Sequence, residues 1–340
     1  MTLRWQTAVG LVVSLALLYW ALHDVSLAEL WGHLRAANLW LLFIAIVIQT
    51  SLFAIRAARW AIFLKPVLRG SSFHSRFATT CIGFMANNLL PARVGEFARA
   101  YAFSRVQPVT VSASFGSLVV ERLFDALTLA VFLAVPLLTP GMNLVGQSGD
   151  EIVGRVVAIL VILGGAATAL LLLIWRPALA VRFFRATIGR LLPGVLRDKI
   201  AEMIESFVQG LGAMRSPELV VKGFAWSFLH WGVGALALYV GMIAFRIFEP
   251  GYLGAVFLQA VNAFGVSIPS SPGFFGLFEA SVRIALAPFG VDAGRAVSFA
   301  VAFHIGSYIP VTVVGLYYLG RLGLSWSEVG HSEEIVEESA

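Results

Sequence analysis

The sequence predicts an all-α polytopic membrane protein with about six full transmembrane helices and two re-entrant, broken-helix hairpins. Of its 340 residues, 59% are hydrophobic and only 13% are charged, roughly half the charged share of a soluble domain. A soluble core of this size would need a larger charged surface. The basic residues also occur in blocks between long apolar runs, as membrane topology requires. The single cysteine, Cys81, excludes a disulfide framework and a cysteine-based metal site.

Full spans are expected wherever about 20 largely apolar residues follow one another, because a helix of that length crosses about 30 Å of hydrocarbon. Several tryptophans stand at the limits of such runs, as an aromatic belt predicts. The first run has no small-residue cleavage site after it, so we interpret it as a membrane anchor rather than a signal peptide. Six runs qualify, at about 5–22, 39–55, 111–138, 152–175, 223–245 and 296–319.

Two shorter apolar segments, 77–90 and 252–268, run directly into proline and glycine breaks. We interpret them as the first arms of hairpins that enter the membrane and turn back, over about 73–105 and 252–290. In each break a glycine follows a proline by four positions, which indicates an internal repeat. Non-helical backbone at membrane depth needs protein or a wet cavity around it, so both breaks are expected to face inward. The predicted break residues are Pro91, Gly95, Pro269, Pro272, Gly273 and Gly276.

The positions of arginine and lysine predict that both termini are cytoplasmic. With six crossings and an inner N-terminus, the segments 56–105 and 176–222 lie inside and hold most of the 24 basic residues. Hairpin one then enters from the cytoplasm and hairpin two from outside. Such a pair is typical of an inverted-topology repeat, which holds a transporter's substrate at its interface.

One transmembrane domain is expected over residues 1–325. Within it, the region at about 176–216 contains an amphipathic helix, either on the inner membrane surface or packed on cytoplasmic loops. Residues 326–340 are acidic without apolar periodicity, which predicts a disordered tail.

Glu121, Arg122 and Asp125 are charged residues inside an apolar run. Charges there cost on the order of a few kcal/mol and mark a function or an obligatory internal partner. Glu121 and Asp125 share a helix face, where two carboxylates repel and need a cation or a shared proton. Arg122 is expected to point about 100° away from them. The predicted cations are Arg93 and Arg99 of hairpin one, and the cluster is expected either to lock that hairpin or to bind a ligand.

Other polar residues near the breaks allow two interpretations each. In hairpin two, backbone N–H groups are free at the start of a new helix, and an i, i+4 acid–base pair follows them. This segment forms either an anion site for a phosphate head group or a turn that permits close packing. Asparagines before the breaks are ligand contacts or helix caps. His304 is expected to be a packing histidine, with a proton relay as the alternative. The residues concerned are Asn87, Asn88, Glu96, Asn262, Ser270, Ser271, Glu279 and Arg283.

Several enzyme motifs are missing from the sequence. It contains no phosphate-binding loop of the GxxxxGK[ST] type, no HExxH zinc motif and no GxSxG nucleophile elbow. ATP hydrolysis by this chain is not expected, and an enzyme is not favoured. No metal, cofactor or nucleic-acid partner is expected.

Three motifs in order resemble one known family. They are Leu90-Pro91-Ala92-Arg93-Val94-Gly95-Glu96-Phe97-Ala98-Arg99, Glu121-Arg122-x-x-Asp125 and Pro272-Gly273-x-x-Gly276-x-x-Glu279. They look like the lysylphosphatidylglycerol synthetase transmembrane-region family, also called the flippase-like domain family, over about residues 5–320. The resemblance implies a bacterial or archaeal membrane protein that moves a lipid or lipid-linked head group between leaflets. The aminoacyl-transferase domain of multidomain members is not present, so lysyl transfer is not expected, and Phe274 replaces a glycine usual in the family.

The leading prediction is a lipid translocator of the cell membrane, not driven by ATP through this chain. Arg93, Arg99 and Arg122, or the second half-helix, would oppose a phosphate. Glu96, Glu121 and Asp125 would hold these arginines, or bind a cationic head group or a proton. One alternative is a non-transporting subunit that anchors or regulates a lipid-synthesising or lipid-modifying partner enzyme, and another is a membrane lipid transferase.

Overall fold

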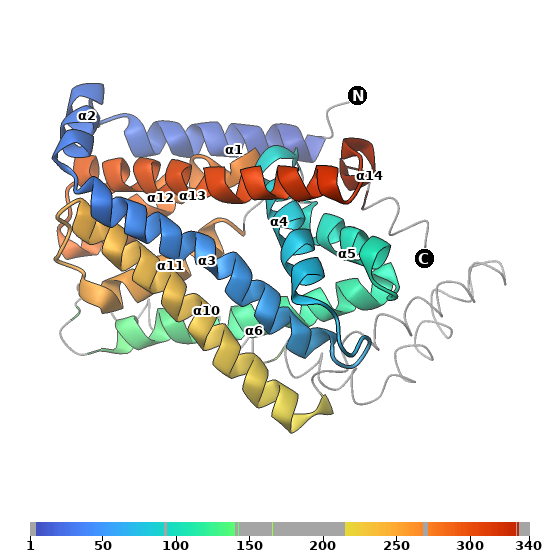
Figure 1. Cartoon of the computed structure of the whole chain (residues 1–340). Coiled ribbons are helices and arrows are strands. Elements are labelled where there is room, and N and C mark those ends of the chain that lie inside the picture. Colours follow the sequence, from blue (N-terminus) through green and yellow to red (C-terminus); the bar gives the residue numbers. More distant parts are fainter. Residues whose placement is uncertain are drawn as a thin grey trace.

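The computed structural model describes residues 5–91, 94–139, 142, 165, 215–267, 271–330 and 332, with side chains from Val9 onward. Figure 1 shows that the regular structure of this part of the chain is helical. The helices are α1 (Trp5–Leu22), α2 (Leu27–Ala36), α3 (Leu39–Leu64), α4 (Phe73–Leu89), α5 (Gly95–Val106), α6 (Val111–Leu138), α10 (Pro217–Ala244), α11 (Gly251–Gly265), α12 (Leu277–Leu286), α13 (Ala293–Arg321) and α14 (Trp326–Gly330), with short 3-10 turns η5 (Pro272–Phe274) and η6 (Ala287–Phe289).

Side-chain caps fix where several of these helices begin. Ser72 accepts from the third residue of α4, and Thr110 does the same for α6. Ser216 precedes α10 and Asp292 precedes α13, each accepting a backbone N–H of the first turn. Each cap satisfies a donor that the helix itself leaves free, so the sequence sets these starts locally.

Within the described part of the chain, three helices are long and apolar enough to cross a membrane: α3, α10 and α13, with mean hydropathies of 2.0, 1.5 and 1.7. They coincide with three of the six expected crossings. Helices α1 and α2 are bent by 74° and together could make a fourth. Helix α6 is 28 residues long, but every window of membrane length within it contains the charges at 121, 122 and 125. The expected crossing at 152–175 lies outside the described residues, as does most of the amphipathic region at 176–216.

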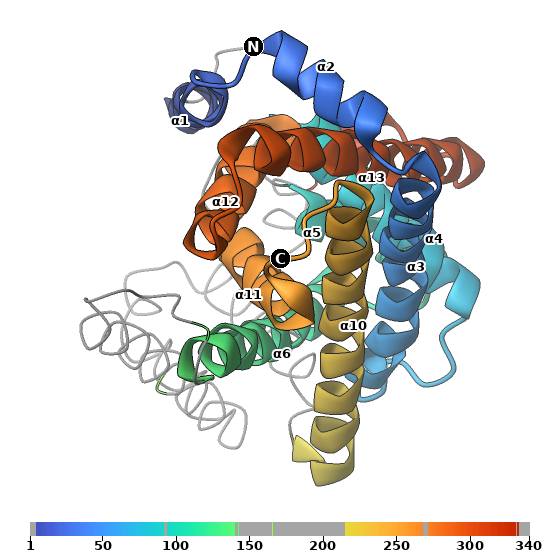
Figure 2. The same cartoon turned by 90° about the vertical axis from the view of Figure 1, so that its left-hand side faces the viewer.

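Helices α3 and α10 run side by side, as both views show, and α13 packs across α4 (Figure 2). The largest apolar core lies between α3, α10, α11, α12 and α13 and includes the buried Phe299 and Phe303. A second core joins α3, α5, α6 and α10 around Trp60, Phe63 and Phe124. Packing in these two cores fixes the positions of the polar side chains on the same helices.

Both predicted breaks separate pairs of helices that fold back on each other. Helix α4 packs against α5, and α11 against α12. In the first pair a Cβ on Gly95 would lie 2.2 Å from the carbonyl oxygen of Gly83, so the two helices approach too closely for a side chain at that point. The name hairpin one is used below for α4 and α5, and hairpin two for α11, η5 and α12.

The acidic segment that follows α13 begins with structure rather than disorder. Trp326–Gly330 form α14, and Glu328 Oε2 accepts from the backbone N–H of Ser325 at 2.7 Å. Tyr101 of α5 donates to the other carboxylate oxygen at 3.1 Å. The expectation of a disordered segment from residue 326 is therefore wrong for these five residues. The positions from 333 onward lie outside the described part of the chain.

Candidate functional site

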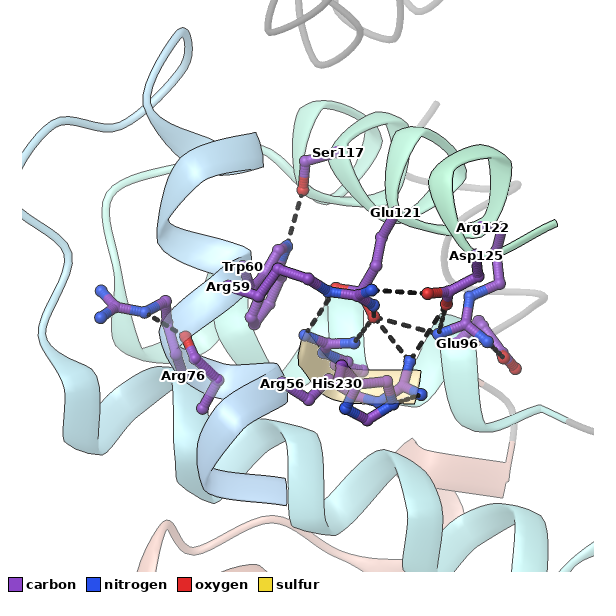
Figure 3. Close-up of polar contacts among 12 residues, drawn as sticks. Arg56, Arg59, Trp60, Arg76, Glu96, Ser117, Glu121, Arg122, Asp125 and His230 are labelled. Carbon is purple, nitrogen blue, oxygen red and sulfur yellow. Dashed lines mark hydrogen bonds and ion pairs between the residues drawn. The ribbon is translucent and has the colours of Figure 1, made fainter. Parts of the chain in front are cut away.

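Charged side chains from three helices meet where α3, α5 and α6 pack together, as Figure 3 shows. The two acids, Glu121 and Asp125, stand four residues apart on α6 and share one face of it. Helix α3 contributes two arginines that stand three residues apart and also share a face. Arginines of α5 and α6 complete the set, which we call the charge cluster: Arg56, Arg59, Arg99, Glu121, Arg122 and Asp125.

Glu121 is fully buried at the centre of the cluster. Its Oε1 accepts from Arg56 Nη1 at 2.8 Å and from Arg122 Nη2 at 3.0 Å, and Arg59 Nη2 lies 3.2 Å away. Arg99 spans both carboxylate oxygens, with distances of 3.1 and 3.2 Å. A carboxylate removed from water needs charge-assisted donors of this kind, which these arginines provide.

Asp125, one turn further along α6, is held from several helices. Arg59 Nη1 donates to its Oδ1 at 2.5 Å, and Trp231 Nε1 of α10 donates to the same oxygen at 2.8 Å. Its Oδ2 lies 3.2 Å from Arg122 Nη2 and 3.4 Å from Arg56 Nη1. The acid therefore ties α6 to both α3 and α10.

The structure answers the question of which cations neutralise the two acids. Arg99 contacts Glu121, as the sequence predicted. Arg122 also contacts both acids, so the expectation that it points away from them is wrong. Its long side chain can fold back along the helix surface, which a helical wheel of Cα positions does not show. Arg93 lies outside the described residues.

Four contributors were missed from the sequence. Arg56 and Arg59 provide half of the arginine contacts to the two acids, but they stand at the end of an apolar run, where arginine is also explained by topology. His230 Nε2 lies 2.8 Å from Arg56 Nη2, and since arginine only donates, this nitrogen accepts. His230 and Trp231 stand in an apolar helix and carry no pattern that points to a site. The i, i+3 spacing of Arg56 and Arg59 was the usable signal.

The cluster is closed on one side and open on the other. Arg59 is fully buried, whereas the side chain of Arg122 is 41% exposed. Glu96, at the start of α5, is 3.9 Å from Arg122 and 29% exposed. Among the described residues, four guanidinium groups face three carboxylates when Glu96 is included, which leaves one positive charge. Arg122, the exposed arginine, stands at the open side.

A pocket opens at this exposed side. Its empty space is about 200 Å³ and is continuous with the outside, although the enclosed part has room for about one water molecule. Arg99 Nε is buried without a hydrogen-bond partner among the described residues. The lining combines two glycines, one aromatic ring and polar groups of hairpin one and α6: Gly83, Phe84, Asn87, Gly95, Glu96, Arg99 and Arg122.

Asn87 and Asn88 stabilise the break of hairpin one. Asn87 Oδ1 accepts from the backbone N–H of Gly95 at 2.8 Å, and its Nδ2 is 3.5 Å from Glu96. Asn88 donates to Thr312 of α13 at 2.8 Å. Of the two interpretations drawn from the sequence, capping is therefore seen at Asn87, which also lines the pocket.

The break of hairpin two is already capped by an internal carboxylate. Glu279 Oε2 accepts from the backbone N–H of Gly276 at 2.7 Å, and the N–H of Ser271 donates to Ser14 of α1 at 2.8 Å. Both donors are engaged within the protein, which favours the close-packing turn of the two interpretations drawn from the sequence. Phe274 adopts a positive φ of 61°, a conformation that favours glycine. Pro269 and Ser270 lie outside the described residues.

The expected i, i+4 pair of hairpin two is not formed. Arg283 instead donates to Asp24 at 2.5 and 2.6 Å, and to the carbonyl oxygens of Trp20 and Ala21. It thereby joins α12 to the end of α1. Glu279 pairs with His304, which is considered below. Asn262 Oδ1 of α11 is buried without a partner among the described residues.

Comparison with known proteins agrees with the motifs. The model of the family described as "Lysylphosphatidylglycerol synthase TM region" matches residues 7–315. Glycosyltransferase AglD of Haloferax volcanii is 30% identical over 67% of this chain, which spans only 40% of that relative's length.

Two further relatives match over most of both chains. A UPF0104 membrane protein of Methanothermobacter thermautotrophicus is 23% identical over 92% of this chain and 91% of its own length. UPF0104 membrane protein MJ1595 of Methanocaldococcus jannaschii is 22% identical over 80% of this chain and 82% of its own. The family match covers most of the chain and all three motifs on which the resemblance rested. This chain is a membrane protein of the lysylphosphatidylglycerol synthase transmembrane-region family.

Proposed function

We propose that this protein translocates a lipid with an anionic, phosphate-bearing head group between the leaflets of the cell membrane. The observation that carries the proposal is the unequal exposure of the charge cluster. Among the described residues the cluster has one more arginine than carboxylates, and its exposed arginine, Arg122, stands at a pocket between hairpin one and α6. A cluster that served only to hold helices together would not need a net positive charge beside a pocket.

The contacts of Arg122 allow an exchange of partners. Its 3.9 Å separation from Glu96 is the longest ion-pair distance in this part of the structure. A phosphate can replace Glu96 there, because guanidinium groups bind phosphate and carboxylate with similar two-point geometry. Arg99 also lines the pocket, and its Nε has no hydrogen-bond partner among the described residues. The lipid tails would stay in the bilayer while the head group occupies the pocket.

Movement of hairpin one is required by this mechanism. The enclosed part of the pocket has room for about one water, so a head group enters only when α5 and α6 separate. We place the opening there because Glu96 and Arg122, on the two helices, form the weakest link across it. No energy source is contained in the charge cluster itself, so exchange would follow the lipid gradient or be coupled elsewhere.

The test is lipid exchange in proteoliposomes that contain the purified full chain. The panel holds phosphatidylglycerol, phosphatidylcholine and an isoprenoid-linked sugar phosphate, the last because one relative is named a glycosyltransferase. Arg122→Gln should lower exchange of the anionic lipids about tenfold, as expected for one lost charge-assisted contact. Arg295→Gln is the matched control, because Arg295 is also paired with two acids, outside the cluster. Equal rates in the two variants would refute the site.

A second candidate function is supported by the closed core of the cluster. Glu121 is fully buried and saturated with arginine contacts, which is what a helix-locking group requires. This feature favours a non-transporting membrane subunit that anchors or regulates a lipid-modifying enzyme. Correctly folded protein that exchanges none of the lipids tested, at any protein-to-lipid ratio, would support this candidate over the translocator.

A further inference from the structure

A second set of buried polar side chains lies between hairpin two and α13, separate from the charge cluster. Glu279 of α12 and His304 of α13 are both buried. Glu279 Oε1 lies 2.7 Å from His304 Nδ1, and the carbonyl oxygen of Gly273 lies 2.9 Å from the other ring nitrogen, Nε2. The imidazole is therefore placed between two oxygen atoms, each within hydrogen-bond distance of one ring nitrogen.

Hydrogen-bond chemistry determines how many protons this arrangement holds. A backbone carbonyl only accepts, so Nε2 of His304 must carry a hydrogen to bond Gly273. Nδ1 faces a carboxyl oxygen, and a bond there needs a second proton, carried by either the ring or the carboxyl group. In both forms the pair holds one proton more than a neutral imidazole beside an ionised carboxylate.

We propose that Glu279 and His304 form a proton-binding site whose bound proton holds the break of hairpin two against α13. When that proton leaves, the ring retains one N–H and cannot donate to both oxygens. One of the two contacts then brings two lone pairs together over less than 3 Å and must open. Proton release therefore detaches either the Gly273 carbonyl or the Glu279 carboxylate from α13.

Both partners of His304 belong to the tightest part of the break. Gly273 has a φ of 71° and Gly276 a φ of 86°, conformations that favour glycine. Glu279 Oε2 accepts from the backbone N–H of Gly276, and Glu279 Oε1 contacts His304. One carboxylate therefore binds both the backbone of the break and the imidazole of α13. A change at the proton site is thus transmitted directly to the backbone of the turn.

The site is shielded from water and from other charges. The rings of Phe275 and Phe278 cover the imidazole, with centroid distances of 4.7 and 4.5 Å. Titratable groups on the packed elements have hydrogen-bond or ion-pair partners elsewhere: Tyr308 of α13 with Asn88, Arg283 of α12 with Asp24, Tyr252 of α11 with Gly232, Arg76 of α4 with Ala57, Glu29 of α2 with Ser26, and Arg56 and Arg59 of α3 with the acids of α6. The rings of Tyr19 of α1 and His74 of α4 pack on His23 and Tyr318, and Cys81 of α4 is buried.

The proton site does not depend on lipid exchange, because its argument uses only the contacts of Glu279 and His304. If the chain does translocate lipid, the site would couple movement of hairpin two to proton uptake and release. The two proposals can fail separately, since the charge cluster is tested by lipid exchange and this site by proton occupancy.

The experiment measures proton occupancy and backbone protection on the full chain in nanodiscs. The protein is labelled with ¹⁵N-histidine, and the His304 signals are assigned by their loss in His304→Gln or, if that variant does not fold, in His304→Asn. At low pH both ring nitrogens should be protonated or hydrogen-bonded. When the pH is raised and the proton is released, the ring should lose this state. Amide-exchange protection of residues 271–279, corrected for intrinsic rates, should then fall about tenfold, the effect of one lost hydrogen bond.

Glu279→Gln separates this site from general effects of pH. A glutamine amide donates to Nδ1 while its oxygen still accepts from Gly276, so the variant imitates the permanently protonated pair. Amide-exchange protection of residues 271–279 in Glu279→Gln should be independent of pH. The control is Glu218→Gln, because Glu218 forms an exposed pair with Lys222. In this control, protection should depend on pH as it does in the wild type. A bare Nδ1 in the wild type at the lowest pH would overturn the proposal. An unchanged pH response in Glu279→Gln would do the same.

Discussion

Arg59 Nη1 donates to Asp125 Oδ1 over 2.5 Å, and the side chains are 0% and 4% exposed. The pair joins α3 to α6 within a chain that contains few charges. Burying two ions is costly, and the cost is recovered only when the geometry is good and further donors are present. Trp231 supplies such a donor to the same oxygen. Removing either member should therefore be costly, because it takes away a partner of a buried charge.

Arg59→Gln should lower the free energy of unfolding by about 3–5 kcal/mol, the usual effect of leaving a buried charge unpaired. Asp125→Asn should have a similar effect, and the double variant should lose less than the sum of the two. The measurement is the thermal aggregation midpoint in detergent. Additive losses would show that the two side chains do not interact, and Asp292→Asn, in an exposed pair with Arg295, serves as control.

Gly95→Ala should destabilise hairpin one. The added methyl group would lie 2.2 Å from the carbonyl oxygen of Gly83 and 2.5 Å from Asn87, a contact that backbone cannot relieve without moving α4 from α5. We expect a loss of about 1–3 kcal/mol or more, as for overpacked cores. The yield of monodisperse protein after heating measures it. Gly320→Ala, in open space on α13, should be neutral or slightly stabilising.

The contact between α5 and α14 should weaken in acid. The backbone N–H of Ser325 holds the pKa of Glu328 below its usual range, and Tyr101 adds a smaller effect in the same direction. A carboxyl group whose pKa is lowered by folding stabilises the folded form above its ordinary pKa and loses that contribution as the pH falls. Amide exchange of residues 326–330, corrected for intrinsic rates, should therefore increase below about pH 4.5.

Glu328→Gln should show the acid behaviour of α14 already at neutral pH. Glu218→Gln changes another exposed carboxylate, far along the chain, and should leave exchange in α14 unchanged. Protection of residues 326–330 that is the same at pH 4 and pH 7 would contradict the role given to Glu328.

Membrane orientation can be tested with single cysteines in a Cys81→Ala background. The basic segments predict that Lys65, at the end of α3, lies in the cytoplasm and that Glu249, between α10 and α11, lies outside. Lys65→Cys should resist an impermeant maleimide in intact cells and react after permeabilisation, whereas Glu249→Cys should react in both. The reverse labelling pattern would invert the topology, and labelling of both positions from the same side would remove the inverted repeat.

The sequence by itself determined the class of protein and the positions of its critical residues. A high apolar fraction with few charges is enough to indicate a membrane protein, and three motifs identified the family, which the comparison confirmed. The acids of α6 and the proline–glycine breaks were found because a charge or a break in an apolar run is conspicuous without any knowledge of neighbours. Helical periodicity also placed Glu121 and Asp125 on one face, and nearness in sequence pointed to Arg99 as a partner, which contacts Glu121.

Only the tertiary structure decided which groups meet. Arg56 and Arg59 could be recognised as partners of the acids only once α3 was seen to pack on α6, because periodicity gives a residue's face but not the helix opposite it. Glu279 was expected beside Arg283, yet His304 and Asp24 take these two side chains, since a buried polar group takes the partner that packing brings within reach. The site's balance of charge is therefore a property of helix packing.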